Sequence, residues 1–294
     1  MLFFVALLVD GALAGAVYAL VALAFVVVYK ASRVINFALG EWVMLGARLV
    51  ATGLAAAGLG LAGALAAAAA GMVALGVVWS RSVLRRLAGQ PPISLIMVTI
   101  GFGALIRGAA ALAFAGIPAS ISLPLPQEPL VVHGVRAPAD KVAGAAIALA
   151  CIAAISWFFH RTRTGVALRA ISDDPEAAMG VGIDLDRHVA MTWAMVGVLS
   201  VLAGTLWTVV AGGGLGVALV GVKVFPIVII GGLDSIPGTL VGAMVVGVLE
   251  SLTAGYVDPL VGGGFGTVAC YLVLIATLFV RPYGLFGRPA VERV

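Results

Sequence analysis

The sequence predicts an all-α, polytopic transmembrane bundle of eight or nine membrane segments with one large polar insertion. Hydrophobic residues make up 63% of the chain and charged residues only 10%, whereas soluble domains carry roughly 25% charged residues. Apolar runs close to the roughly 20 residues needed to cross the hydrocarbon recur along the whole chain. We therefore expect one transmembrane domain over residues 1–294, with lipid as its main solvent.

Nine apolar segments can be read in order, with boundaries at about residues 8–29, 35–54, 58–80, 93–115, 140–160, 188–211, 219–233, 237–255 and 265–280. The first lacks the basic start of a signal peptide, so we expect it to be retained as a helix. The seventh is short for a full crossing, and Gly231, Gly232 and Pro237 interrupt the run after it. A broken or re-entrant pair fits there, which leaves a count of eight open.

Basic residues are distributed unevenly between the two sides of this bundle. If the polar stretch 161–187 is cytoplasmic, two of the 17 basic residues fall outside (Arg136, Lys141) and three fall within segments (Arg48, Arg107, Lys223). Twelve fall inside: Lys30, Arg33, Arg81, Arg85, Arg86, Arg161, Arg163, Arg169, Arg187, Arg281, Arg288 and Arg293. The positive-inside rule then predicts an external N-terminus and a cytoplasmic C-terminus. Membrane orientation thus explains the net charge of +4, and we expect no nucleic-acid partner.

The stretch 161–187 is the only long charge-rich segment of the chain. Residues 164–172 have helical composition, and the run Asp-Asp-Pro-Glu at 173–176 is typical of a helix start. An aspartate there would cap, the proline would occupy the first turn, and the glutamate would lie at the positive end of the dipole. Gly180 and Gly182 are placed to end this short helix. We expect it either to dock in a cleft of a soluble partner or to lie on the lipid headgroups.

The longest outer loop, about residues 116–139, is rich in proline. We expect an irregular structure rather than a helix, because proline fixes φ and removes a backbone donor. The loop would shield the outer mouth, contact an external partner, or serve as a simple connector. Its prolines are Pro118, Pro124, Pro126, Pro129 and Pro138.

Ionisable groups within the apolar segments are candidates for a translocation path. An Arg, Lys or Asp at the centre of a membrane helix costs roughly 2.5–3.5 kcal/mol, so such groups are rarely incidental. The alternative is structural pairing between helices, for example of Glu41 or Glu250 with Arg107. The stretch 36–41 is the strongest path candidate, because Gly40 and Gly46 allow irregular backbone at membrane depth. The path candidates are Tyr18, Asn36, Glu41, Thr99 and Arg107.

The run GGLDSIPG at residues 231–238 breaks a helix close to the cytoplasmic side of the predicted bundle. It is interpreted either as a hinge or gate, or as a plain tight turn between two helices. The candidates for the hinge are Gly231, Gly232, Pro237 and Gly238.

Enzymatic chemistry finds little support. His133, His160 and His188 fall at loops or segment ends, and Cys151 and Cys270 lie in apolar runs without a metal-ligand spacing. Gly216 and Gly221 have the spacing of a phosphate loop, but the Lys-Ser/Thr pair does not follow the second glycine. We expect no catalytic residues, no metal and no cofactor of its own.

Four motifs carry a resemblance that covers essentially the whole chain. They are INFALGE at 35–41, TRTGVALRAISDDPEAAMGVGIDLDR at 162–187, IIGGLDSIPGTLVGAMVVGVLE at 229–250 and RPYGLFGRPAVERV at 281–294. Together they resemble the branched-chain amino acid ABC transporter permeases, and more closely the smaller of the two permease subunits of such systems. Two positions depart from the family pattern. Leu39 stands where histidine is common, and Asp234 stands where glycine is usual.

The resemblance implies a permease subunit of an ATP-driven importer in a bacterial inner membrane. It implies a heterodimer with a second homologous permease, two ATP-binding subunits that bind the ATP, and a periplasmic solute-binding protein. The polar stretch would then be the coupling helix that contacts an ATPase subunit. Its residues are Thr164, Gly165, Arg169, Asp173, Asp174, Glu176, Ala177, Gly182 and Asp186.

Three alternatives stay open at this point. The solute of such a permease could be urea, a short amide or an aromatic acid rather than a branched-chain amino acid. The chain could be a secondary transporter driven by an ion gradient, which would carry solute without ATP. A membrane enzyme is the third class, and the lack of a clustered acid, base or metal set argues against it.

Overall fold

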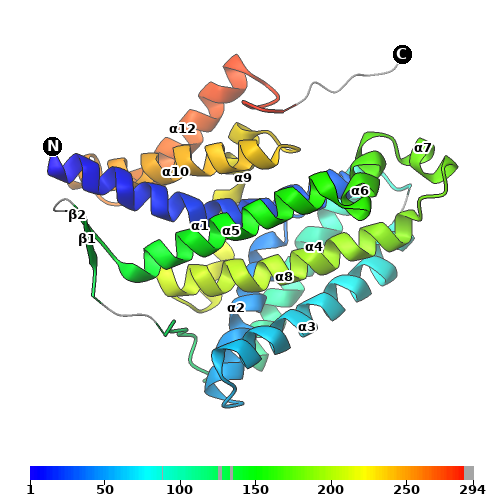
Figure 1. Ribbon diagram of the computed structural model, residues 1–294, viewed down its shortest axis with the longest axis horizontal. Helices are drawn as coiled ribbons and strands as arrows, with labels where there is room; N and C mark the ends of the chain where they lie inside the picture. The colour runs from blue at the N-terminus through cyan, green and yellow to red at the C-terminus, as the bar shows by residue number, and fades with distance from the viewer. Residues whose placement is uncertain (88, 125–127, 133–134, 288–294) are drawn as a thin grey trace. The chain divides into compact units, whose positions relative to one another are not determined.

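The computed structural model describes residues 1–87, 89–124, 128–132 and 135–287, and almost all of its regular structure is helical (Figure 1). The α-helices are α1 (Leu2–Ser32), α2 (Leu39–Ala55), α3 (Leu61–Trp79), α4 (Pro92–Ala113), α5 (Ala139–Arg161), α6 (Arg163–Asp173), α7 (Pro175–Gly180), α8 (Leu185–Ala211), α9 (Val220–Gly231), α10 (Ile236–Tyr256), α11 (Asp258–Val261) and α12 (Phe265–Val280). A π-helical turn η1 (Ser80–Leu84) and a 3₁₀ turn η2 (Arg85–Leu87) extend α3, and a 3₁₀ turn η3 (Leu215–Leu219) precedes α9.

Each of the nine predicted apolar segments overlaps with one of these helices. Within the described residues, six helices are long and apolar enough to cross a membrane: Leu2–Ser32, Leu61–Leu87, Ile93–Ala113, Ala139–Arg161, Leu185–Ala211 and Ile236–Tyr256. The apolar stretches Leu215–Gly231 and Phe265–Val280 are shorter, as predicted for the seventh segment. The all-α polytopic fold class predicted from composition and hydropathy is therefore confirmed.

The proline-rich outer loop is only partly irregular. No helix forms among its described residues, as predicted, but β1 (Leu130–Val132) pairs with β2 (Val135–Ala137) in an antiparallel hairpin with Val131 opposite Arg136. The expectation of a wholly irregular loop was wrong there, because neither triplet contains proline and each contains valine, which favours extended backbone. Pro126 and His133 lie outside the described residues, as do Arg288 and Arg293 of the charge count.

The chain divides into two compact units, which are described separately. One unit comprises Met1–Val26, Pro124–Ile152 and Lys223–Val294, and the other comprises Val27–Leu123 and Ala153–Val222. We call them the terminal unit and the central unit. The prediction of a single transmembrane domain over 1–294 stays a prediction.

The core of the central unit is a bundle of α2, α3 and α8, with α4 packed on α2. Its centre is aromatic: Trp42 lies 5.4 Å from Trp193 between ring centroids, and Trp79 stacks on Phe102 at 3.8 Å. Small residues allow the helix backbones to approach closely, as in other membrane bundles. A Cβ placed on Gly46 of α2 would lie 2.9 Å from the carbonyl oxygen of Ser200 in α8.

In the terminal unit, α1 packs on α10, and α10 packs on α9 and α12 through similar small residues. A Cβ on Gly11 would lie 2.7 Å from the carbonyl oxygen of Gly247, so these two helices contact through backbone. Helix α10 begins at a Ser235 cap, whose Oγ accepts a 3.0 Å hydrogen bond from the Gly238 amide. The polypeptide after α12 returns to the end of α9, where the Leu285 amide donates to the Ile230 carbonyl at 2.8 Å.

Candidate functional site

The predicted coupling element forms two short helices, α6 and α7, in the central unit. Helix α6 starts at Thr162, whose hydroxyl accepts a 3.0 Å hydrogen bond from the Gly165 amide. Gly165 is buried against the end of α5, and a Cβ there would lie 2.6 Å from the Cα of Phe159. This threonine cap was not predicted, although the sequence Thr-Arg-Thr-Gly at 162–165 is typical of a helix start. Thr164, the next predicted residue, lies half-buried in the first turn.

Helix α7 follows after one residue and has the predicted capping. The carboxylate of Asp174 accepts a 3.0 Å hydrogen bond from the Ala177 amide, Pro175 occupies the first turn, and Glu176 follows it. Asp173 is the last residue of α6 rather than the cap of α7. Helix α7 ends at Gly180, and Gly182 has φ of +87°, a conformation that suits glycine.

One face of α7 points away from the rest of the central unit. Ala178 is buried, with 3% of its surface exposed. The Met179 and Val181 side chains are 50% and 79% exposed, and Glu176 and Ala177 are exposed beside them. We call Glu176, Ala177, Met179 and Val181 the α7 face. It offers a small apolar surface with an acidic edge at the tip of the element.

Two basic side chains connect this element to the membrane helices. The guanidinium of Arg33, the residue after α1, donates two hydrogen bonds to the Ser172 carbonyl, at 3.2 Å from Nε and 3.0 Å from Nη2. Arg85 of η2 forms a 3.0 Å ion pair with Asp186 at the start of α8, both largely exposed. Arg169 is half-buried, and its Nε is enclosed without a hydrogen-bond partner among the described residues. Arg169 is therefore less accessible to a partner than Glu176.

Most of the predicted path residues meet where α2 begins and α4 passes it. Arg107 of α4 donates a 2.5 Å hydrogen bond from Nη2 to Glu41 Oε1 in an ion pair, with the two side chains 49% and 13% exposed. The structural alternative, in which Glu41 pairs with Arg107, is what the structure contains, and a role of these residues in a translocation path stays a prediction. The other option, Glu250 with Arg107, is not what the structure contains.

Asn36 and Thr99 stabilise the backbone just before α2, next to this ion pair. Residues 33–38 are not helical, and Asn36 is buried with 1% exposure. Its Oδ1 accepts a 3.0 Å hydrogen bond from the Ala38 amide, while its Nδ2 has no partner among the described residues. Thr99 Oγ1 accepts from the Phe37 amide at 3.3 Å and donates to the Ile96 carbonyl at 2.8 Å. Thr99 and Arg107, eight positions apart on α4, therefore both contact residues 36–41.

Glu41 and Arg48 do not act as a pair. The Arg48 side chain donates from Nη2 to the carbonyls of Phe114 and Ile117, at 2.7 and 3.1 Å, beyond the end of α4. Its guanidinium also lies over the Phe114 ring, 5.2 Å from the centroid. It closes the end of α4, where carbonyl groups lack helical partners.

The expectation of irregular backbone at Gly40 and Gly46 was wrong, because both lie within α2. A Cβ on Gly40 would lie 3.0 Å from the Cα of Gly221, so this glycine permits a close helix contact instead. The irregular backbone falls one step earlier, at residues 33–38. Its turn is stabilised by the Asn36 side chain rather than by a glycine.

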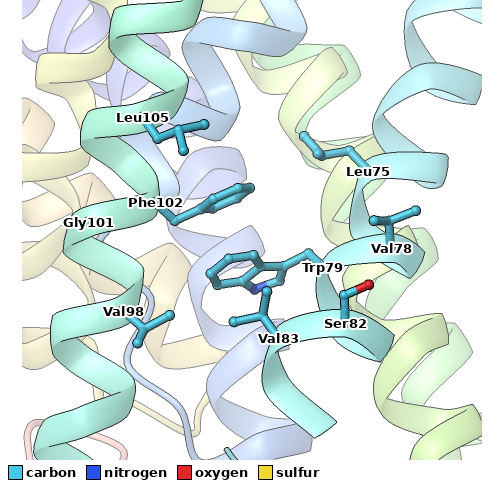
Figure 2. A pocket seen from close by; sticks show the side chains of 9 residues that line it. All are labelled: Leu75, Val78, Trp79, Ser82, Val83, Val98, Gly101, Phe102 and Leu105. Carbon is cyan, nitrogen blue, oxygen red and sulfur yellow. The ribbon is translucent and has the colours of Figure 1, made fainter. Parts of the chain in front are cut away.

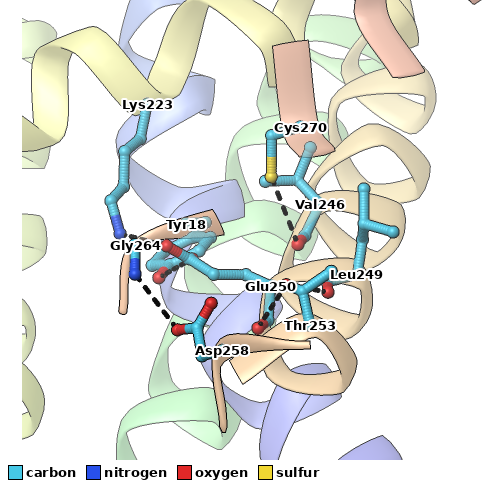
Figure 3. Close-up of polar contacts among 9 residues, drawn as sticks. All are labelled: Tyr18, Lys223, Val246, Leu249, Glu250, Thr253, Asp258, Gly264 and Cys270. Atoms are coloured by element: carbon cyan, nitrogen blue, oxygen red, sulfur yellow. Dashed lines mark hydrogen bonds and ion pairs between the residues drawn. The ribbon is translucent and has the colours of Figure 1, made fainter. Parts of the chain in front are cut away.

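A second polar cluster lies in the terminal unit (Figure 3). The Glu250 carboxylate of α10 accepts a 2.5 Å hydrogen bond from the Tyr18 hydroxyl of α1 and pairs with the Lys223 ammonium of α9. The Lys223 and Glu250 side chains are 33% and 22% exposed. Three helices thus contribute one residue each. Sequence reasoning identified Lys223 and Glu250 as ionisable residues in apolar segments but did not find this pairing.

The predicted hinge residues form a turn between α9 and α10. Helix α9 ends at Gly231, and Gly232 has φ of +104°. The α10 cap follows, with Pro237 and Gly238 in its first turn. The Phe286 amide donates to the Gly231 carbonyl at 3.1 Å, so the C-terminal motif closes over the turn. The tight-turn interpretation describes this conformation, and a hinge role stays a prediction.

The predicted residues therefore form separate groups. Asn36, Glu41, Thr99 and Arg107 belong to the central unit together with the coupling element, whereas Tyr18 and the 231–238 turn belong to the terminal unit. Within the part of the chain that the structure describes, no group of three or more His, Cys, Asp or Glu residues could hold a metal ion. The chemistry available is ion pairing and hydrogen bonding within an apolar bundle.

The chain is similar over nearly its full length to a family of transport permeases. The family model described as branched-chain amino acid transport system / permease component matches residues 7–280. The chain is 28% identical over 309 residues to the high-affinity branched-chain amino acid transport system permease protein LivH of Escherichia coli strain K12, covering 100% of this chain and 98% of that protein. It is 29% identical over 303 residues to the corresponding permease protein BraD of Pseudomonas aeruginosa, covering 98% and 97%.

An archaeal relative matches a shorter region. The probable branched-chain amino acid transport permease protein LivH of Methanocaldococcus jannaschii is 35% identical over 135 residues, which is 44% of this chain and 42% of that protein. No solved structure matches the chain.

Proposed function

This chain belongs to the family of branched-chain amino acid transport system permease components, and we propose that it is the permease subunit of an ATP-driven importer of branched-chain or related amino acids. The full-length similarity to permease proteins of such systems is the observation that carries the proposal. The bundle of apolar helices fits a protein that crosses the membrane several times. The energy would come from ATP bound by separate partner subunits.

The α7 face supports a docking role for α6–α7. Helix α7 is short and capped at both ends. Its exposed face combines apolar side chains at Met179 and Val181 with the carboxylate of Glu176. Such a helix tip fits an apolar cleft with a basic rim. We propose that this cleft belongs to an ATP-binding subunit. A second permease, a second ATP-binding subunit and a periplasmic solute-binding protein complete the proposed assembly in the inner membrane.

Motion at the docking element would reach the membrane through Arg33. Arg33 is the first residue of the non-helical stretch 33–38, and its two hydrogen bonds join that stretch to Ser172 near the end of α6. That stretch carries Asn36 and is hydrogen-bonded to α4 through Thr99. A displacement of α6 would therefore move the stretch 33–38 and with it the contact between α2 and α4. We propose this chain of contacts as the route from ATP-driven closure to the membrane helices.

The α2–α4 contact supplies the charges that suit a zwitterionic solute. An amino acid carries an ammonium and a carboxylate, and the Glu41–Arg107 pair presents a carboxylate and a guanidinium within one contact. The 49% exposure of the Arg107 side chain leaves it accessible in this chain. We propose Asn36, Glu41, Thr99 and Arg107 as path residues, with the 231–238 turn as a hinge. A urea, amide or aromatic-acid solute stays the alternative.

Charge reversal on the α7 face tests the docking proposal. In a complex purified with its ATP-binding subunits, Glu176→Arg combined with Met179→Gln should abolish co-purification of the ATPase, because it inverts the charge and removes the apolar contact. Glu128→Arg, the same reversal at an exposed residue of the outer loop, should leave co-purification unchanged. Normal assembly of the double variant would refute the docking assignment.

Reconstitution separates the proposed importer from a secondary transporter. Proteoliposomes containing the complete complex should take up leucine only with ATP and the solute-binding protein present. The chain reconstituted alone, with a proton or sodium gradient imposed, should take up none. Gradient-driven uptake by the chain alone would establish the ion-coupled alternative instead.

A further inference from the structure

An apolar groove runs between α3 and α4 in the central unit (Figure 2). Its volume is about 420 Å³, within the size range of small-molecule sites. The lining is apolar apart from Ser82, with the stacked rings of Trp79 and Phe102 forming its floor. Leu75 and Val78 of α3 and Val98 and Leu105 of α4 form its walls, as Figure 2 shows.

Both helices of the groove are candidate membrane spans that the chain itself covers poorly. Only 22% of the apolar window is buried in each of Leu61–Leu87 and Ile93–Ala113, compared with 56% in Leu185–Ala211. Val78 and Leu105, two of the wall residues, are 59% and 64% exposed. In a membrane such apolar side chains contact hydrocarbon.

Basic side chains gather at one end of the groove. Helix α3 proper has 19 residues, which at about 1.5 Å per residue spans close to the hydrocarbon thickness of about 30 Å. The turns η1 and η2 that follow it therefore fall at headgroup level. Arg81, Arg85 and Arg86 are all exposed there, within one turn of the groove residues Ser82 and Val83.

Two of these arginines are available to an anion. Arg85 pairs with Asp186, whereas neither Arg81 nor Arg86 forms an ion pair within the described part of the chain. From this end the groove extends inward along α3 to Leu75, seven residues before Ser82, or about 10 Å. An apolar channel of that length below a cationic rim matches a phospholipid in orientation and charge.

We propose that this groove holds an acyl chain of an anionic phospholipid, whose phosphate lies beside Arg81 and Arg86. The apolar lining provides the affinity for the chain, and the arginines provide the preference for an anionic headgroup. The bound lipid fills the space between α3 and α4 and supports the Trp79–Phe102 stack.

Gly101 allows the groove to be filled without disturbing the helix. It lines the groove, and a Cβ placed on it meets no atom within 4 Å. Gly108, also in α4, has the same open surroundings but does not line the groove. Gly101→Leu therefore occupies the proposed site, and Gly108→Leu is its matched control.

The test is native mass spectrometry of the complex that this chain forms with its partner subunits. The complex is placed in nanodiscs of phosphatidylglycerol and phosphatidylethanolamine, and the lipids that it retains on release are measured. We expect wild type and Gly108→Leu to retain phosphatidylglycerol, and Gly101→Leu to lose about tenfold in affinity for it. Arg81→Gln with Arg86→Gln should weaken phosphatidylglycerol retention by about fivefold per arginine. Retention of phosphatidylethanolamine should not change in this double variant. Arg161→Gln with Arg163→Gln, which removes two exposed charges elsewhere in the central unit, should retain wild-type affinity.

Two results would overturn the proposal. The first is retention of phosphatidylglycerol by Gly101→Leu at the wild-type level. The second is disulfide cross-linking of Val78→Cys to a partner polypeptide in the assembled complex, which would make the groove a protein interface. The lipid measurement does not depend on transport, so it stands or falls separately from the proposed function.

Discussion

The guanidinium group of Arg33 donates two hydrogen bonds to the carbonyl oxygen of Ser172, across 139 positions of the sequence. Arg33 has φ of +54°, a left-handed conformation that is uncommon outside glycine, asparagine and aspartate. The contact holds the end of α6, and with it the α7 face, next to the exit of α1. It is a direct side-chain connection between the α6–α7 element and the stretch that carries Asn36.

Replacing Arg33 should uncouple ATP hydrolysis from transport. Arg33→Asn tolerates the left-handed backbone but removes the guanidinium, and we expect a loss of about 1.5–3 kcal/mol in the placement of α6. Transport per ATP hydrolysed in proteoliposomes should fall, while co-purification of the ATPase persists. Arg163→Asn, at the exposed start of α6, is the control. Unchanged coupling in Arg33→Asn would exclude this contact from the transmission route.

The N-cap of α7 can be tested by a pair of neighbouring aspartates. Asp174→Ala removes the hydrogen bond to the Ala177 amide and should destabilise α7 by about 1 kcal/mol. Asp173→Ala changes an exposed residue at the end of α6 and should have little effect. Amide hydrogen exchange over residues 175–180 measures the difference directly. Equal protection in the two variants would contradict the capping role.

The Glu41–Arg107 pair should behave as a coupled unit. Glu41→Gln or Arg107→Gln alone leaves the other charge without its partner, so each single variant should be more impaired than the double variant. We expect an interaction free energy of about 0.5–3 kcal/mol from the cycle. Thermal unfolding of the purified complex measures the stability part, and leucine uptake measures transport. Additive single effects would show that the two charges act independently.

The stability of the protein should depend on whether the charges of Lys223 and Glu250, in the polar cluster of the terminal unit, remain paired. Lys223→Met removes the cation paired with the Glu250 carboxylate and leaves the Tyr18 hydroxyl bound to it, which should destabilise the protein by about 1–3 kcal/mol. Adding Glu250→Leu removes the second charge and should restore much of that stability, as replacement of paired charges by apolar residues often does. If the double variant regains stability but not uptake, the cluster acts in transport. If it regains both, the cluster is structural.

Close packing of the central bundle depends on Gly204 of α8. A Cβ there would lie 3.0 Å from the Ala47 amide nitrogen and still closer to the Val43 carbonyl of α2. Gly204→Ala should therefore cost about 1–3 kcal/mol from overpacking. Gly108→Ala, with open surroundings, should be neutral or slightly stabilising. Thermal unfolding of both variants in the same detergent provides the comparison.

Features that depend on neighbouring residues could be predicted from the sequence. The nine apolar segments follow from hydropathy, and a helix start at residues 173–176 with an exit at Gly180 or Gly182 follows from residue types within nine positions of one another, although the choice of Asp174 over Asp173 as the cap did not. The short hairpin was missed because the prolines of the loop outweighed two proline-free triplets that contain valine. Gly40 and Gly46 were misassigned because a glycine in an apolar run can serve either a turn or a close helix contact.

The sequence by itself determined that the chain is a helical membrane protein, where its apolar segments lie and where its long charge-rich stretch begins and ends. Only the tertiary structure decided that Glu250 pairs with Lys223 rather than with Arg107, that Arg33 holds Ser172, and that α3 and α4 enclose an apolar groove. Hydropathy and helix capping are properties of residues close in the chain. Ion pairs and grooves depend on which helices become neighbours, and in lipid that choice is made by small differences in packing between surfaces that are all apolar.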